Sequence, residues 1–147
     1  MKRLIGWIAA AFVPAIIGAP FTAPDYYRRL RTPDWGPPSA AFGPVWSILY
    51  LTIGISAWLV DRRDGGGGAL RLWWVQLALN AAWTPLFFGL RRPGVALAEI
   101  VAMWAAIVAT TVAFLRHRLA AGALLLPYLA WVTFAAALNF AIWRRNR

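Results

Sequence analysis

The chain has 147 residues, of which 61% are hydrophobic and 14% are charged, with a formal net charge of +10. Soluble domains carry about 25% charged residues, so this composition indicates an integral membrane protein, and the length suggests one domain. The absence of cysteine excludes disulfides, thiolate metal sites and a cysteine nucleophile, and one histidine with five acidic residues gives little material for a metal cluster. We therefore predict no catalytic residue and no metal ligand.

Five apolar segments are long enough to cross the hydrocarbon core of a bilayer, which takes about 20 residues. They cover residues 4–22, 40–60, 70–90, 94–115 and 119–143, so we expect an all-α bundle of five transmembrane helices, with 1–147 as a single domain. The first segment also resembles a secretory signal peptide, because Lys2 and Arg3 precede it and small residues occur near Ala19. We favour a retained helix, and processing of the N-terminus stays open.

The connection between the first two helices is the longest polar one, and it contains the turn Trp35-Gly36-Pro37-Pro38. The proline pair excludes a helix there and favours an extended, shaped loop. Gly65 to Gly68 predict a flexible second loop. The last two connections are short, which makes the third, fourth and fifth helices antiparallel neighbours.

The basic residues fall in small groups between the apolar segments, as they do where membrane helices meet lipid headgroups. Membrane lipid is therefore the expected anionic partner, and nucleic acid is not. With five helices, seven basic residues lie on one side of the membrane: Lys2, Arg3, Arg62, Arg63, Arg71, Arg116 and Arg118. The eight on the other side are Arg28, Arg29, Arg31, Arg91, Arg92, Arg144, Arg145 and Arg147. This near-equal division leaves the orientation undecided.

Polar and aromatic side chains share one face on each of three predicted helices, because positions three, four and seven apart coincide on a helix. On the third helix this stripe contains Trp73, Gln76, Asn80, Trp83 (with Thr84 beside it) and Phe87. The second helix carries Trp46, Tyr50 and Gly54, and the fifth carries Tyr128, Trp131, Ala135 and Asn139. Three such stripes favour a cavity with aromatic walls and room at Gly54 and Ala135. Interhelical packing and interfacial anchoring are the alternatives.

Two isolated ionisable residues have competing interpretations. Glu99 lies about 8 Å along the fourth helix, and an ionisable group at such depth indicates a functional site. The alternative, which we favour, is that Glu99 lies near enough to the interface to reach water or to pair with an arginine such as Arg91 or Arg92. We expect His117 to be an exposed loop residue rather than a haem ligand.

The combination of motifs resembles the TspO/MBR family of tryptophan-rich sensory proteins, which is related to the mitochondrial translocator protein. The matching residues are Trp35-Gly36-Pro37-Pro38, Pro44-Val45-Trp46 with Tyr50, Gln76, Asn80 and Trp83 with Pro85 and Phe88, and Pro127-Tyr128, Trp131 and Leu138-Asn139. The resemblance covers nearly the whole chain. It implies five transmembrane helices, a homodimer, and a pocket open towards the long first loop, which binds porphyrins, sterols and synthetic drugs. A bacterial envelope membrane is the expected location, inner or outer.

By position, Trp46 and Asn80 resemble ligand-contacting residues, with Trp131 and Ala135 opposite, and Trp35 with the proline pair resembles a lid. The full ligand-binding set that we predict is Trp35, Trp46, Tyr50, Gln76, Asn80, Trp83, Phe87, Tyr128, Trp131, Ala135 and Asn139. The family's sterol motif is altered here because Phe140 replaces its tyrosine, which argues against sterol binding. Porphyrin is thus expected as a ligand and not as an obligatory cofactor, with Arg28, Arg29 or Arg31 as partners for its propionates.

The leading functional hypothesis is a membrane receptor or sensor for protoporphyrin IX or haem-type tetrapyrroles that regulates a tetrapyrrole or stress response. A tetrapyrrole or sterol transporter is an alternative, although no inverted repeat is evident. Another alternative is light-dependent porphyrin degradation, since clustered Trp rings could react with an excited porphyrin. No nucleophile, metal site or acid–base pair supports dark chemistry, so an enzyme is not the favoured interpretation.

Overall fold

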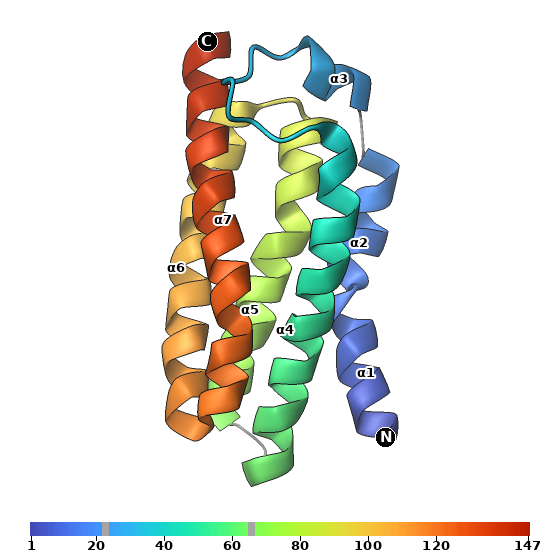
Figure 1. Cartoon of the computed structure of the whole chain (residues 1–147), viewed down its shortest axis with the longest axis vertical. Helices are drawn as coiled ribbons and strands as arrows, with labels where there is room; N and C mark the ends of the chain where they lie inside the picture. Colours follow the sequence, from blue (N-terminus) through green and yellow to red (C-terminus); the bar gives the residue numbers. More distant parts are fainter. Residues whose placement is uncertain (22–23, 65–66) are drawn as a thin grey trace.

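The structure, a computed structural model, describes residues 1–21, 24–64 and 67–147, and the secondary structure in these residues is entirely helical. Five long columns run side by side, and the two termini lie at opposite ends (Figure 1). The first column consists of α1 (Lys2–Ala11), α2 (Val13–Gly18) and the 3-10 turn η1 (Ala19–Phe21). The other four are α4 (Phe42–Asp64), α5 (Gly67–Thr84) continued by the π-helix η3 (Pro85–Gly89), α6 (Pro93–His117) and α7 (Leu119–Asn146). The predicted all-α bundle of five helices is confirmed.

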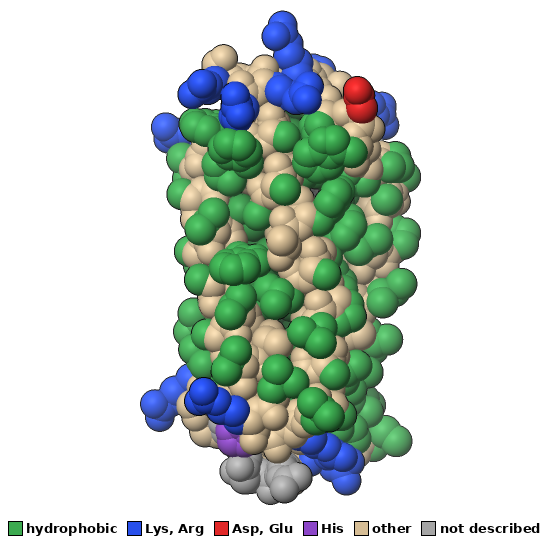
Figure 2. Space-filling model, turned by 60° about the vertical axis from the view of Figure 1, so that its left-hand side comes forward, with side chains coloured by type: hydrophobic (Ala, Val, Ile, Leu, Met, Phe, Trp, Pro, Cys, Tyr) green, Lys and Arg blue, Asp and Glu red, His purple; other side chains and the backbone are tan. Residues whose placement is uncertain are grey.

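Among the described residues, four helical stretches are long and apolar enough to cross a membrane: Lys2–Phe21, Phe42–Arg62, Pro93–His117 and Leu119–Asn146. The remaining column, α5 with η3, is not among these four stretches and carries Gln76 and Asn80. These amides are only 1% and 5% exposed and face the bundle. Figure 2 shows a broad band of hydrophobic side chains on the surface, with lysines and arginines gathered at both ends. This surface suits a chain whose ends lie at the headgroups on either side of a bilayer.

The first column is broken where the sequence predicts one continuous helix over 4–22. α1 ends at Ala11 and α2 begins at Val13, and Pro14, which has no N–H to donate, occupies the first turn of α2. Residue 22, the predicted end, lies outside the described residues. The break lets α1 pack against α4 while α2 packs against α5.

The connections also differ from the prediction. The short helix α3 (Pro24–Arg29) and the 3-10 turn η2 (Ser39–Ala41) occur in the long first connection, whereas residues 36–38 stay non-helical as expected. Gly67 and Gly68 belong to α5 and not to a loop, and residues 65 and 66 lie outside the described residues. α3 lies across one end of the bundle (Figure 1).

Gly54 has a different role from the one predicted. A Cβ atom at this position would lie 2.6 Å from the Cα atom of Ile8, so the glycine allows α1 to approach the backbone of α4. Gly54 therefore leaves no room for a cavity. The same helix pair is joined near the end of the bundle by Asp61, whose Oδ2 accepts from Trp7 Nε1 at 3.1 Å and lies 3.6 Å from Arg3 Nη1.

The half of the bundle nearest the N-terminus is filled with side chains. Ile53, Trp73, Ile107 and Val132 are fully buried there and belong to one hydrophobic core. Such close packing leaves the opposite half, under α3, as the part of the bundle that is hollow.

Candidate functional site

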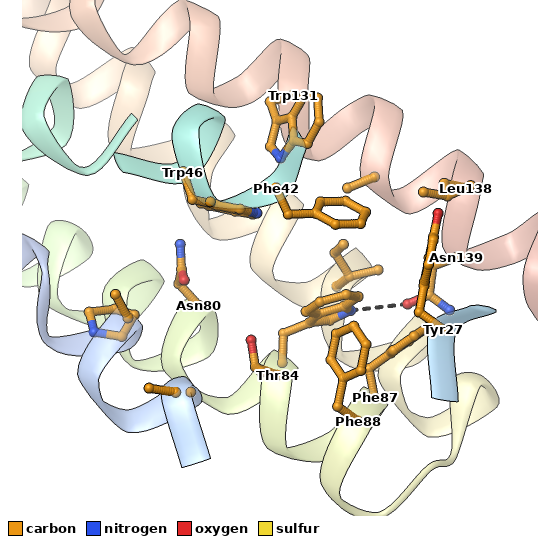
Figure 3. Close-up of a pocket in the computed structure, with 18 of the residues that line it drawn as sticks. Tyr27, Phe42, Trp46, Asn80, Thr84, Phe87, Phe88, Trp131, Leu138 and Asn139 are labelled. Atoms are coloured by element: carbon orange, nitrogen blue, oxygen red, sulfur yellow. Dashed lines mark hydrogen bonds between the residues drawn. The ribbon is translucent and has the colours of Figure 1, made fainter. Parts of the chain in front are cut away.

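A cavity of about 560 Å³ lies between the helices in the half of the bundle covered by α3 (Figure 3). Its walls come from α2, α4, α5 with η3, α6 and α7. Eight of the predicted ligand-binding residues line it: Trp46, Tyr50, Asn80, Trp83, Phe87, Trp131, Ala135 and Asn139. The three stripes read from the sequence thus meet around one space.

Aromatic rings form a large part of the cavity wall, and four of them form two stacked pairs. Trp46 stacks on Tyr50 with ring centroids 5.4 Å apart and an interplanar angle of 28°. Trp83 stacks on Phe87 at 4.8 Å and 21°, on the other side of the space. In Figure 3 the rings of Trp46, Phe42, Phe87 and Phe88 surround the open centre. These faces can bind a flat, apolar ligand.

A hydrogen-bond network forms the floor of the cavity and joins α4, α5 and α7. Tyr50 donates its hydroxyl to Asn80 Oδ1 at 3.2 Å, and Asn80 Nδ2 donates to the Tyr128 hydroxyl at 2.7 Å. Tyr128 donates in turn to Gln76 Oε1 at 2.7 Å, and Gln76 Nε2 donates to the carbonyl of Trp73 at 2.9 Å. The buried side-chain amides of Asn80 and Gln76 therefore have hydrogen-bond partners within the bundle. These partners explain how an apolar helix tolerates two amides.

A second polar connection lies higher in the wall. Trp83 Nε1 donates to Asn139 Oδ1 at 3.0 Å, and Asn139 Nδ2 donates to the carbonyl of Pro93 at 2.9 Å (Figure 3). This links α5, α6 and α7 and holds the Trp83 ring in place beside the cavity.

Three residues of the predicted ligand-binding set do not reach the cavity. Gln76 and Tyr128 lie behind the floor, where their polar atoms are used by the network. Trp35 is 51% exposed and packs edge-on against Phe134, with centroids 5.7 Å apart, on the outside of the wall. Helical spacing predicted the correct faces for Gln76 and Tyr128, but the depth at which each side chain lies depends on the neighbouring helices.

The sequence analysis missed the wall formed by α2. Phe12, Pro14, Ala15, Gly18 and Ala19 line the cavity, and they bring no polar side chain to it. The available signal was the four-residue spacing of Pro14 and Gly18, with the small residues Ala15 and Ala19 beside them, which marks a helix face that permits close approach.

The segment over the cavity is attached to the bundle at several points. Tyr27 and Arg28 of α3 line the cavity, and burial raises the pKa of Tyr27 above its ordinary value near 10, so its hydroxyl stays protonated. That hydroxyl donates to the carbonyl of Pro37 at 3.2 Å. Farther along, Asn146 of α7 accepts from the backbone N–H of Arg31 and donates to its carbonyl, both at 3.0 Å.

A family model described as the TspO/MBR family matches residues 5–144. The chain belongs to this family. It is 40% identical to the tryptophan-rich sensory protein of Cereibacter sphaeroides over 95% of this chain and 89% of the relative. It is 39% identical to the translocator protein of Homo sapiens over 97% and 89% of the two chains, and 38% identical to the tryptophan-rich protein TspO of Archaeoglobus fulgidus over 98% and 97%. The resemblance read from the motifs and the integral membrane character are thereby confirmed.

Two isolated residues of this TspO/MBR chain differ from their sequence interpretations. Glu99 forms no ion pair with Arg91 or Arg92, and both its carboxylate oxygens are buried without a hydrogen-bond partner among the described residues. The local reason is that Arg91 turns into the left-handed region, with φ of 54°, and places its guanidinium over the ring of Tyr26 at 5.2 Å. His117 is the last residue of α6 and half-buried, not an exposed loop residue.

Proposed function

We propose that this chain is a membrane receptor that binds a porphyrin-class tetrapyrrole in the cavity under α3. The observation that carries the proposal is the combination of a 560 Å³ cavity with paired aromatic walls and a floor whose polar groups are already satisfied. A cavity of this volume suits a ligand of drug size or somewhat larger. Aromatic faces provide stacking surface for a planar macrocycle.

The charge near the cavity mouth supports a ligand with acidic substituents. Arg28 lines the cavity, its side chain is largely exposed, and its guanidinium has one long contact of 3.4 Å to Asp25. A guanidinium can form charge-assisted hydrogen bonds to a carboxylate, such as a porphyrin propionate. This leaves the apolar macrocycle for the aromatic part of the site.

The floor favours a receptor over a transporter. A ligand that crossed the membrane through the bundle would have to separate Tyr50, Asn80 and Tyr128 and then pass the filled core around Trp73 and Ile53. The relatives bear both kinds of name, a sensory protein and a translocator protein. We propose the receptor because the cavity ends where the network begins.

Titration of the protein in nanodiscs with protoporphyrin IX in the dark, followed by tryptophan fluorescence, tests the proposal. We expect saturable quenching, and at least about a tenfold loss of affinity in Ala135→Leu, which fills the cavity, corresponding to about 1.4 kcal/mol. Ala137→Leu is the matched control, because Ala137 is exposed on the same helix. Linear quenching that is equal in all three proteins would mean that porphyrin only partitions into lipid. Uptake into sealed vesicles would instead support a transporter.

A further inference from the structure

Thr84 differs from the other serine and threonine residues that the structure describes within α4, α6 and α7. Six serine and threonine side chains described within α4, α6 and α7 donate to a backbone carbonyl three or four residues earlier, at 2.7–2.9 Å: Ser47, Thr52, Ser56, Thr110, Thr111 and Thr133. This back-bonding is the usual way to satisfy a hydroxyl in an apolar helix. Thr84 Oγ1 makes no hydrogen bond with any residue that the structure describes.

The position of Thr84 directs its hydroxyl into the cavity. Thr84 is the last residue of α5, immediately before the π-helix that begins at Pro85, and it lines the cavity wall. In Figure 3 its oxygen points into the open centre. Thr84 follows Asn80 by four residues, about one helical turn, so the two side chains lie on the same face of α5. A π-helical segment inside a helix often occurs at a functional site, and here it adjoins the one unpartnered serine or threonine hydroxyl described within α4 to α7.

The wall beside Thr84 packs closely and offers its hydroxyl no polar side chain. A Cβ atom on Gly18 of α2 would lie 3.2 Å from the Cβ and Cγ2 atoms of Thr84 and 3.3 Å from Oγ1, so the glycine lets α2 approach the Thr84 side chain closely. Pro14 and Ala15, which also line the cavity from α2, have apolar side chains. A partner for the hydroxyl must therefore come from whatever occupies the cavity.

Two indole N–H groups in the cavity wall also lack a hydrogen-bond partner within the described residues. The indole nitrogens of Trp46 and Trp131 have no hydrogen-bond partner among the described residues, in contrast to Trp83, which donates to Asn139. An indole N–H can only donate, and a hydroxyl can donate or accept. The unmet groups of the wall thus complement a ligand that is rich in acceptors.

We propose that Thr84 is a specificity-determining residue that donates a hydrogen bond to an oxygen acceptor, a carboxylate or carbonyl, on the ligand of this cavity. The inference rests on the proposed porphyrin-class ligand and adds the kind of substituent that the site selects. A ligand without such an acceptor would cover the hydroxyl and leave it unsatisfied in an apolar site, which weakens binding. The site therefore discriminates between an oxygen-bearing macrocycle and a purely alkyl one.

Two porphyrins and three variants test this inference in nanodiscs, in the dark. Protoporphyrin IX carries carboxylates, whereas etioporphyrin carries only alkyl substituents. We expect Thr84→Val to weaken protoporphyrin IX about tenfold and to strengthen etioporphyrin, because the valine leaves no hydroxyl unsatisfied beneath the alkyl porphyrin. Thr84→Ser should retain protoporphyrin affinity within about twofold. Thr110→Val is the control, because that hydroxyl bonds to the carbonyl of Ala106 in α6 and does not line the cavity. Thr84→Val should also unfold at the same denaturant midpoint as the wild type, since no hydrogen bond within the chain is lost.

Other outcomes would overturn the inference in distinguishable ways. Saturable binding of protoporphyrin IX that is identical in wild type and Thr84→Val would refute the role of Thr84 and leave the receptor proposal intact. Equal weakening of both porphyrins in Thr84→Val would show that the residue acts through shape and not through its hydroxyl. Absence of saturable binding by the wild type would refute the receptor proposal together with the inference.

Discussion

The hydroxyl of Tyr128 is the central group of the hydrogen-bond network behind the cavity floor, so Tyr128→Phe should destabilise the bundle without changing its shape. The residue is 0% exposed, and its hydroxyl takes part in two hydrogen bonds of 2.7 Å, from Asn80 and to Gln76. Removal of the oxygen leaves an amide N–H and an amide oxygen without partners in an apolar interior. Hydrogen bonds between membrane helices average about 0.6 kcal/mol, so two set a lower limit of about 1.2 kcal/mol. With the cost of the unsatisfied amides we expect about 2–3 kcal/mol.

Reversible unfolding in mixed micelles, titrated with a denaturing detergent, measures this loss. Tyr27→Phe is the matched control, because it removes one longer hydrogen bond of 3.2 Å, to Pro37, outside the spans. It should cost no more than about 1 kcal/mol. A loss below about 0.5 kcal/mol for Tyr128→Phe would refute the argument that the network holds α5 to α7. The argument would also be refuted if the losses of unfolding free energy in Tyr128→Phe and Gln76→Leu simply added in the double mutant. Two residues that are hydrogen-bonded to each other should give a non-additive double mutant.

Two further predictions concern packing and the segment over the cavity. Gly54→Ala should destabilise the chain by about 1–3 kcal/mol in the same unfolding assay, because its Cβ would collide with the backbone of Ile8. Gly43→Ala, with nothing within 4 Å of the added Cβ, should be close to neutral, and equal effects of the two changes would contradict the close helix contact. Asn146→Ala removes both hydrogen bonds to the backbone of Arg31, so amide exchange in residues 30–38 should accelerate while the spans keep their protection. Unchanged exchange in that segment would show that Asn146 does not restrain it.

Much of the architecture could be predicted from local patterns. Apolar runs of about 20 residues with basic flanks predict spans because hydrocarbon admits backbone only when its hydrogen bonds are satisfied within the helix. The spacing of Trp46 and Tyr50, and of Asn80 and Trp83, placed these side chains on shared faces because 3.6 residues complete a turn. These predictions depend on the geometry of a single helix, which the sequence specifies directly.

The pairings across the bundle depended on tertiary structure. No pattern within one helix indicates that Asn80 meets Tyr128, that Asn139 meets Trp83, or that Gly54 is occupied by α1 instead of opening a cavity. Each of these contacts depends on the rotation and axial shift of two helices relative to one another, and on the break before α2 that directs it towards α5. The sequence by itself determined that this is a five-helix membrane bundle of the TspO/MBR type with polar and aromatic stripes. Only the packing of the helices decided which of those side chains satisfy each other and which, like Thr84, remain free to meet a ligand.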